Sequence, residues 1–147
     1  MIPRWHILFG AIFTILVWIV FPNISPVFYW VIFLSTFMID IDHYLLGVAK
    51  TGKWGLFSSL EYFRMLVKKE KHNKMRGIRK KGNLFVIHTI EVLAVLGVLG
   101  YYSDWIFYMF VGFIFHFLVD LVGLIYNDEV YRRYFFLVDW LKNSKES

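Results

Sequence analysis

Apolar residues run in long, nearly unbroken stretches along this chain, and short polar or basic segments separate them. Four stretches are long enough to span a bilayer, at about 1.5 Å of rise per helical residue against roughly 30 Å of hydrocarbon. They are Trp5–Phe21, Pro26–Ala49, Asn83–Tyr101 and Asp104–Tyr126. The pattern predicts an all-α integral membrane protein, in which residues 1–147 form a single membrane domain built as a four-transmembrane-helix bundle.

The basic residues are confined to one set of connecting segments. All 16 lysines and arginines lie at the N-terminus, between Lys50 and Lys81, or from Arg132 onward. For four spanning helices these segments are on the same side, and the positive-inside rule places them in the cytoplasm. The N and C termini are therefore expected to be cytoplasmic, in a cytoplasmic or inner membrane.

The long loop of residues 50–82 carries 11 of the 16 basic residues, interspersed with apolar ones. This mixture predicts a cytoplasmic amphipathic helix that lies on the membrane and attracts anionic lipid headgroups. A solvated loop that only sets the topology is the alternative. The tail, residues 131–141, predicts a second interfacial helix. Membrane lipids are the expected partners, no nucleic acid is expected, and the oligomeric state stays open.

Composition limits the chemistry available to the chain. Hydrophobic residues make up 59% and aromatic residues 21%, more than a soluble domain of this size needs for its core. The chain has no cysteine. A metal would therefore have to be bound by imidazole and carboxylate groups.

Seven ionisable side chains fall inside the four apolar stretches, where a central acid costs about 2.5 to 3.5 kcal/mol unless it is compensated. Counted from the cytoplasmic ends, all seven lie at a similar depth, roughly 8 to 15 Å. A common depth on helices that alternate in direction predicts one shared site. The seven residues are Asp40, Asp42, His43, His88, Glu91, His116 and Asp120.

The spacing of these residues predicts which of them face the site. His116 and Asp120 are four residues apart, and His88 and Glu91 are three apart, so each pair projects from one side of its helix. Asp42 lies about 200° round from Asp40 on an ideal helix, so it either reaches the metal through a local distortion or supports a ligand from behind.

Imidazole with carboxylate and no sulfur suits Zn²⁺, with Mn²⁺ or Fe²⁺ as alternatives, and seven groups suffice for one or two ions. Such a centre can activate water, with Glu91 or Asp42 as general base. His6 opens the first helix, where a surface histidine is expected and closure over the cluster is the alternative. The competing interpretation is an inert site, or buried polar pairs that hold helices together.

Three segments resemble one known family. They are residues 37–43, with the motif Asp40-x-Asp42-His43, residues 86–89, with His88 and Thr89, and residues 116–123, with His116-x-x-x-Asp120. Together they resemble the inner-membrane metal-dependent hydrolases known as LexA-binding membrane hydrolases, which are distantly similar to zinc-dependent phospholipase C. His6 and Gly10 look like the opening motif of that family.

The resemblance implies a metal-dependent hydrolase, with Asp40, Asp42, His43, His88, His116 and Asp120 as ligands. It covers the helical body and not the basic loop or the tail. Glu91 is not part of the pattern. Thr89 stands where a serine is usual, and Arg76-Gly77 lies further from His88 than the corresponding arginine and glycine of the family.

The resulting hypothesis is a membrane-embedded, phospholipase-like hydrolase that acts on a phospholipid or lipid-linked phosphoester from the cytoplasmic leaflet. Two alternatives remain at this point. Acids and histidines on three helices are also typical of a proton-coupled or metal-ion transporter, although the outer halves of the helices offer almost no polar lining. A non-catalytic membrane anchor would use only the basic loop.

Overall fold

The computed structural model describes residues 3–143, and within these residues the chain is entirely helical, without strands, as predicted. Lys145, which was counted in the charge pattern, lies outside the described residues. The long helices are α1 (Pro3–Val20), α2 (Pro26–Met38), α3 (Ile41–Thr51), α4 (Leu56–Met75), α5 (Ile90–Gly100) and α6 (Asp104–Tyr126). A short helix α7 (Leu137–Asn143) and two 3₁₀ turns, η1 (Val86–His88) and η2 (Val130–Arg132), complete the chain.

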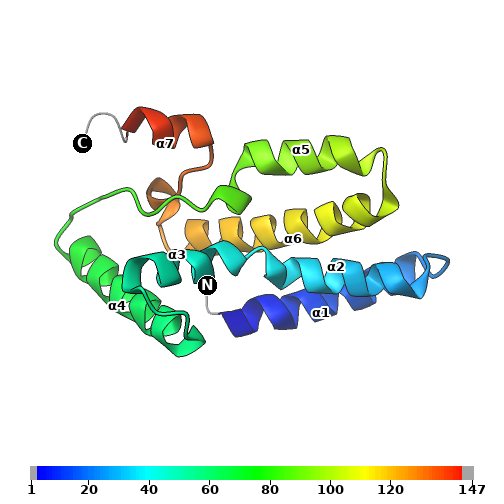
Figure 1. Ribbon diagram of the computed structural model, residues 1–147, viewed down its shortest axis with the longest axis horizontal. Helices are drawn as coiled ribbons and strands as arrows, with labels where there is room; N and C mark the ends of the chain where they lie inside the picture. The colour runs from blue at the N-terminus through cyan, green and yellow to red at the C-terminus, as the bar shows by residue number, and fades with distance from the viewer. Residues whose placement is uncertain (1–2, 144–147) are drawn as a thin grey trace.

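Four helices form the body of the molecule. Helix α2 packs against α1 and α6, and α5 packs against the opposite side of α6, so that the four lie side by side (Figure 1). Pro26 begins α2 and the Tyr29 hydroxyl donates to the Phe21 carbonyl at 2.6 Å, which closes the turn between α1 and α2. Helix α3 leads away from this body and packs against α4.

The number of long apolar helices differs from the prediction of four spanning helices. Two helical stretches, Pro26–Thr51 and Asp104–Tyr126, are long and apolar enough to cross a membrane. The apolar helices Trp5–Val20 and Ile90–Gly100 are shorter. By length and composition, the described residues therefore contain two candidate spans, and the predicted count of four is wrong.

The third predicted span fails because its first half is not an α-helix. Helix α5 begins at Ile90 and has 11 residues, which is about 16 Å of length. Upstream of it the backbone bonds to the C-terminal tail instead of to itself: the Gly82 amide donates to the Arg132 carbonyl and the Ile90 amide to the Phe135 carbonyl. These bonds hold the segment before α5 in an extended course, with η1 as its one helical turn.

The second predicted span is present but interrupted. Ile39 and Asp40 form a turn between α2 and α3, and the amides of Asp40 and His43 make turn-type bonds to the Phe37 and Asp40 carbonyls. Ile39 is fully buried at this point, against Leu93 and Phe113. The interruption changes the direction in which the following acidic residues project.

Two predicted surface helices are observed with different bounds. The basic loop contains α4, which has 20 residues, and large apolar side chains such as Trp54 and Phe57 lie exposed at its beginning. Glu70 on α4 forms an ion pair with Arg132, and burial still raises the pKa of Glu70 because the loss of solvent outweighs the attraction of the guanidinium. In the tail, predicted as a helix over 131–141, helix begins only at Leu137, because residues 133–136 are extended alongside the segment before α5.

Helix α6 approaches α2 closely at Gly112. A Cβ atom at this position would lie 2.6 Å from the Ile32 carbonyl oxygen and 2.7 Å from the Ser35 Cβ. Backbone atoms cannot move aside as a flexible side chain can, so only glycine fits. This contact brings α6 near enough to α2 for residues one turn further along both helices to share a site.

We expect Gly112→Ala to destabilise the protein by about 1 to 3 kcal/mol, because the added methyl group must push α6 away from α2. Thermal unfolding in a neutral detergent measures the change. Gly97→Ala is the matched control, because its Cβ would meet only the outer edge of the Phe110 ring, at 3.2 Å. Equal melting temperatures for the two variants would contradict the close-packing assignment.

Candidate metal centre

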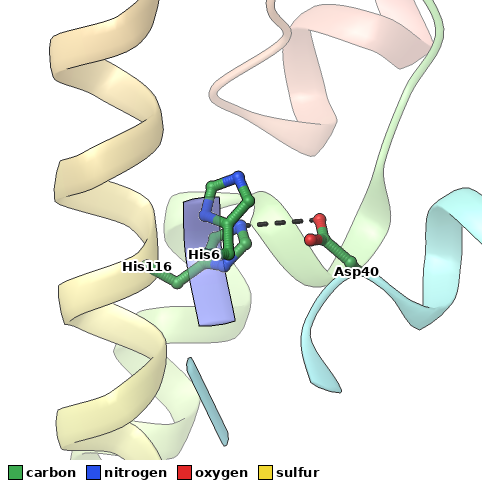
Figure 2. A group of neighbouring side chains, drawn as sticks. All are labelled: His6, Asp40 and His116. Carbon is green, nitrogen blue, oxygen red and sulfur yellow. Dashed lines mark ion pairs between the residues drawn. The ribbon is translucent and has the colours of Figure 1, made fainter. Parts of the chain in front are cut away.

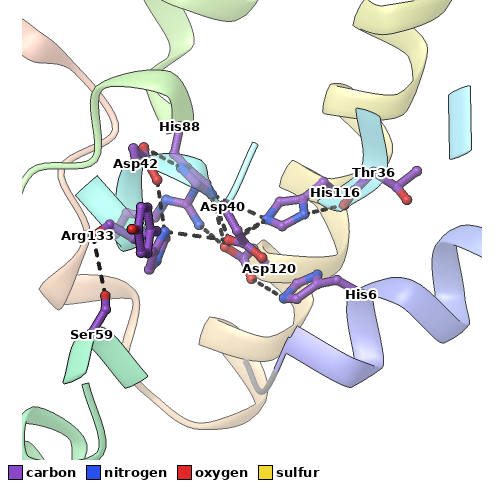
Figure 3. Close-up of polar contacts among 11 residues, drawn as sticks. His6, Thr36, Asp40, Asp42, Ser59, His88, His116, Asp120 and Arg133 are labelled. Carbon is purple, nitrogen blue, oxygen red and sulfur yellow. Dashed lines mark hydrogen bonds and ion pairs between the residues drawn. The ribbon is translucent and has the colours of Figure 1, made fainter. Parts of the chain in front are cut away.

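Four side chains from three parts of the chain converge beside the turn between α2 and α3 (Figure 3). Asp40 comes from the turn itself, His88 from η1, and His116 and Asp120 from successive turns of α6. Both histidines are 1% exposed. The shared depth in the sequence thus corresponds to a real meeting point in space.

The four groups present one atom each to a common point. His88 Nε2 lies 3.3 Å from His116 Nε2, and Asp40 Oδ1 lies 3.6 Å from each of these nitrogens. Asp120 Oδ2 is 3.7 Å from His116 Nε2 and 4.0 Å from His88 Nε2. In a tetrahedral site with zinc bonds of about 2.0 to 2.2 Å, ligand atoms are about 3.3 to 3.6 Å apart. The separations among His88, His116 and Asp40 match that geometry, and those from Asp120 to the two nitrogens are slightly longer.

The outer nitrogens of both rings define their protonation. His116 Nδ1 lies 2.7 Å from the Thr36 carbonyl oxygen, and His88 Nδ1 lies 2.9 Å from Asp42 Oδ2. Both oxygens are acceptors, so each Nδ1 carries a proton, and in a ring with a single proton Nε2 is left as an acceptor. With both rings neutral, two Nε2 lone pairs face each other and two carboxylate oxygens, an arrangement that a bound cation, or a second proton on one ring, stabilises.

The sequence allowed Asp42 either to reach the metal or to support a ligand from behind, and the structure places it behind a ligand. Its Oδ2 accepts from His88 Nδ1, and its Oδ1 accepts from His43 Nδ1 at 2.9 Å. Asp42 is not one of the groups whose atoms can share an ion among the described residues. A carboxylate behind a ligating histidine orients the ring and makes its other nitrogen more basic.

His6 lies in the cluster and not on the surface, contrary to the expectation for it. Its side chain is 3% exposed, and its ring stacks on that of His116 with centroids 4.2 Å apart (Figure 2). Its Nε2 lies 3.4 Å from Asp120 Oδ1 (Figure 3). His6, Asp40 and His116 form one of the groups that can hold a metal ion. The N-terminal helix therefore closes over the site.

His43 lies at the opposite edge of the cluster. Its Nδ1 is 3.5 Å from Asp40 Oδ1, and its ring stacks on Phe85 at 3.8 Å between centroids. Asp40, His43 and His88 form a second group that can hold an ion, and His88, His116 and Asp120 form a third. Because Asp40, His88 and His116 each belong to two of these groups, the donors suffice for one ion or for two neighbouring ones.

Glu91 does not join the cluster. Its Oε1 accepts from the amide of Leu137, the first residue of α7, at 2.8 Å, while its Oε2 is buried without a hydrogen-bond partner. Glu91 is also absent from the groups that can hold an ion in the described part of the chain. The spacing of three residues from His88 does not apply, because the turn at Thr89 separates η1 from α5.

Arg133 is a member of the site that the sequence reasoning missed. Its Nη1 donates to Asp120 Oδ2 at 2.9 Å, and its guanidinium lies over the rings of Phe117 and Phe135. Arg133 had been counted only among the basic residues that indicate topology. The signal available in the sequence was its place among Tyr131, Tyr134 and Phe135, since aromatic neighbours are typical of an arginine that is partly buried.

No protein-family model, curated protein or solved structure matches this chain. The resemblance of the three short motifs to a hydrolase family therefore stays a prediction. What the structure establishes is a cluster of histidines and aspartates that can hold a metal ion.

We expect Asp40→Asn to lower the affinity for zinc by about 100-fold or more, because it removes the charge of a carboxylate that faces both Nε2 atoms. Glu91→Gln is the matched control and is expected to keep the wild-type affinity, since its carboxylate contacts the tail. Competition with a chromophoric chelator, on protein stripped of metal and then titrated, measures both affinities. Equal losses in the two variants would show that the metal site extends to Glu91.

Proposed function

We propose that this protein is a membrane-embedded, metal-dependent hydrolase. The observation that carries the proposal is the pair of buried Nε2 lone pairs, 3.3 Å apart, that face the carboxylates of Asp40 and Asp120. A helix-stabilising polar network would instead pair donors with acceptors. With both rings neutral, the Nε2 atoms and the carboxylate oxygens that face them are all acceptors, and Arg133 donates to Asp120 from the side. That is the character of a cation site.

Asp40, His88, His116 and Asp120 would hold the metal, with His6 and His43 available at its two edges. Nitrogen and oxygen donors suit Zn²⁺ best, with Mn²⁺ or Fe²⁺ as alternatives, and the shared groups accommodate one or two ions. A metal bound there supplies Lewis acidity and lowers the pKa of a water molecule to near neutrality.

The protein groups around the centre have separable tasks. Asp42 keeps the proton on Nδ1 of His88, and the Thr36 carbonyl does the same for His116, so that both rings keep Nε2 for the metal. Of the two carboxylates predicted as general base, Asp42 has both oxygens bonded to histidines, so in this proposal it acts by orienting His88 and not by taking a proton from water itself. Glu91 is dropped as the base, because the contact of its carboxylate is with Leu137.

The proposed location is a cytoplasmic or inner membrane, with both termini and the basic loop in the cytoplasm, a topology in which the shorter helices α1 and α5 enter the bilayer beside the two candidate spans. The two candidate spans and the large apolar side chains exposed along α1 and α6, such as Trp18, Ile19 and Val122, support the membrane location. The basic residues of α4 would meet anionic headgroups. The proposed substrate is a phospholipid or lipid-linked phosphoester that reaches the centre from the cytoplasmic leaflet.

We expect His116→Ala to reduce hydrolysis of a phosphoester lipid by about 100-fold or more, because it removes a ligand of the metal. The assay incubates zinc-loaded protein with vesicles of phosphatidylglycerol and phosphatidic acid and follows the released products by phosphorus NMR. His72→Ala is the control, because His72 is exposed on α4, away from the cluster. Wild-type protein that binds no stoichiometric metal, or that moves metal into sealed vesicles without hydrolysis, would overturn the proposal.

A further inference from the structure

A cavity of about 1370 Å³ opens beside the metal centre. The cluster residues Asp40, His43, His88 and Asp120 line it on one side. Helix α4 lines another side, and α3 contributes Ile41 and Tyr44. The cavity is larger than the roughly 300 to 1,000 Å³ of typical ligand pockets. Its occupant therefore has a substantial body in addition to the group that reaches the metal.

The walls of the cavity divide into an apolar part and a charged part. The apolar side chains are Phe37, Met38, Leu56, Leu60, Phe63 and Val67. The charged groups are the cluster, Arg133, and on α4 Glu70, Lys71 and Lys74, with Arg132 paired to both Glu70 and Glu129. A wall of this kind fits a molecule that has an apolar chain and a polar head.

Arg133 indicates the charge of the polar head group. Its side chain is 10% exposed, its Nη1 is taken by Asp120, and its Nη2 is buried without a hydrogen-bond partner. A buried donor that stays unpaired costs about 1 to 3 kcal/mol, and more on a charged group. The rings of Phe117 and Phe135 hold the guanidinium plane in place. Arg133 is one of the residues that line the cavity, and a preorganised guanidinium with an unsatisfied donor favours an anionic ligand.

Phosphate fits this position better than carboxylate. With Nη1 taken by Asp120, one phosphate oxygen can accept from Nη2 while the others remain for a metal, and a phosphate has more oxygens to divide in this way than a carboxylate. Asp120 contacts both Arg133 and the two Nε2 atoms, so the two cationic sites share one carboxylate and lie within reach of one head group.

We propose that the cavity binds a phosphate-bearing amphiphile, with its phosphate on Nη2 of Arg133 at the edge of the metal centre and its apolar chain along the inner face of α4. Arg133 is then the residue that selects a phosphate head, and Leu60 belongs to the wall that selects a chain. This inference rests on the proposed function, since it uses the same centre, and it adds the class and the orientation of the substrate.

The first test of the inference distinguishes the contribution of the Nη2 donor of Arg133 from that of its positive charge. Arg133→Lys keeps the positive charge beside Asp120 but cannot also reach the head group. We expect zinc content to stay at the wild-type level and affinity for dodecylphosphonate to fall about tenfold, measured by titration calorimetry in a neutral detergent. Arg79→Lys is the control: Arg79 is a surface residue paired with Asp128, and its replacement should leave the affinity unchanged. Wild-type affinity in Arg133→Lys would overturn the role of Arg133.

The second test concerns the chain. Leu60→Trp adds bulk to the cavity wall, so we expect dodecylphosphonate to bind about tenfold more weakly, while ethylphosphonate keeps its affinity. Met65→Trp on the exposed side of α4 is the control and should bind both compounds as the wild type does. An equal loss for both phosphonates in Leu60→Trp would overturn the placement of the chain.

The phosphonate probes contain a carbon–phosphorus bond in place of the ester, so they report binding without hydrolysis. Tight binding of dodecylphosphonate that depends on Arg133, in a protein that hydrolyses no phosphoester lipid, would support this inference and overturn the proposed hydrolase. Hydrolysis of lipids with no preference for a phosphate head would support a hydrolase and overturn this inference.

Discussion

The structure depends on the mutual placement of acceptor groups that repel one another. Two imidazole nitrogens and two carboxylate oxygens lie within 4.0 Å of their neighbours in a buried site, and the Nδ1 protons are committed to Thr36 and Asp42. Removing such groups from water without a compensating charge is costly. The close contact of α2 and α6, the turn at Asp40, and the closure by α1 all hold these groups together against that repulsion. A cation bound between these groups would turn their repulsion into attraction. The same ion would then stabilise the fold and form the proposed metal centre.

Much of the site could be predicted because charges in an apolar helix are expensive and their depth can be counted. Asp40, His43, His88, His116 and Asp120 were predicted to meet, and the structure brings them together. The all-helical fold followed from the apolar pattern. Both inferences use local information that can be read from the sequence, namely the type of each residue and its distance from the end of its apolar segment.

The errors have a common physical origin, since each one involves contacts between segments that are distant in the sequence. Hydropathy cannot show that the tail takes the backbone bonds of the segment before α5, so the third span was predicted to start too early, and Glu91 was placed on the wrong face. Nor can it show that α1 folds over the cluster, which buries His6, or that Arg133 turns inward to Asp120. Arginine near a membrane is usually a sign of topology, and that general rule concealed its role here.

Asp120 lies where the earliest and the latest described parts of the chain meet, because it contacts His6 from one and Arg133 from the other. During synthesis this carboxylate has its histidine partner available from the start but lacks its arginine until residue 133 has left the ribosome. The centre is therefore completed late, after the long helices have already been made. An ion that arrived before that moment would meet an open, more acidic cluster, so the order in which the chain emerges would govern when a bound ion becomes enclosed.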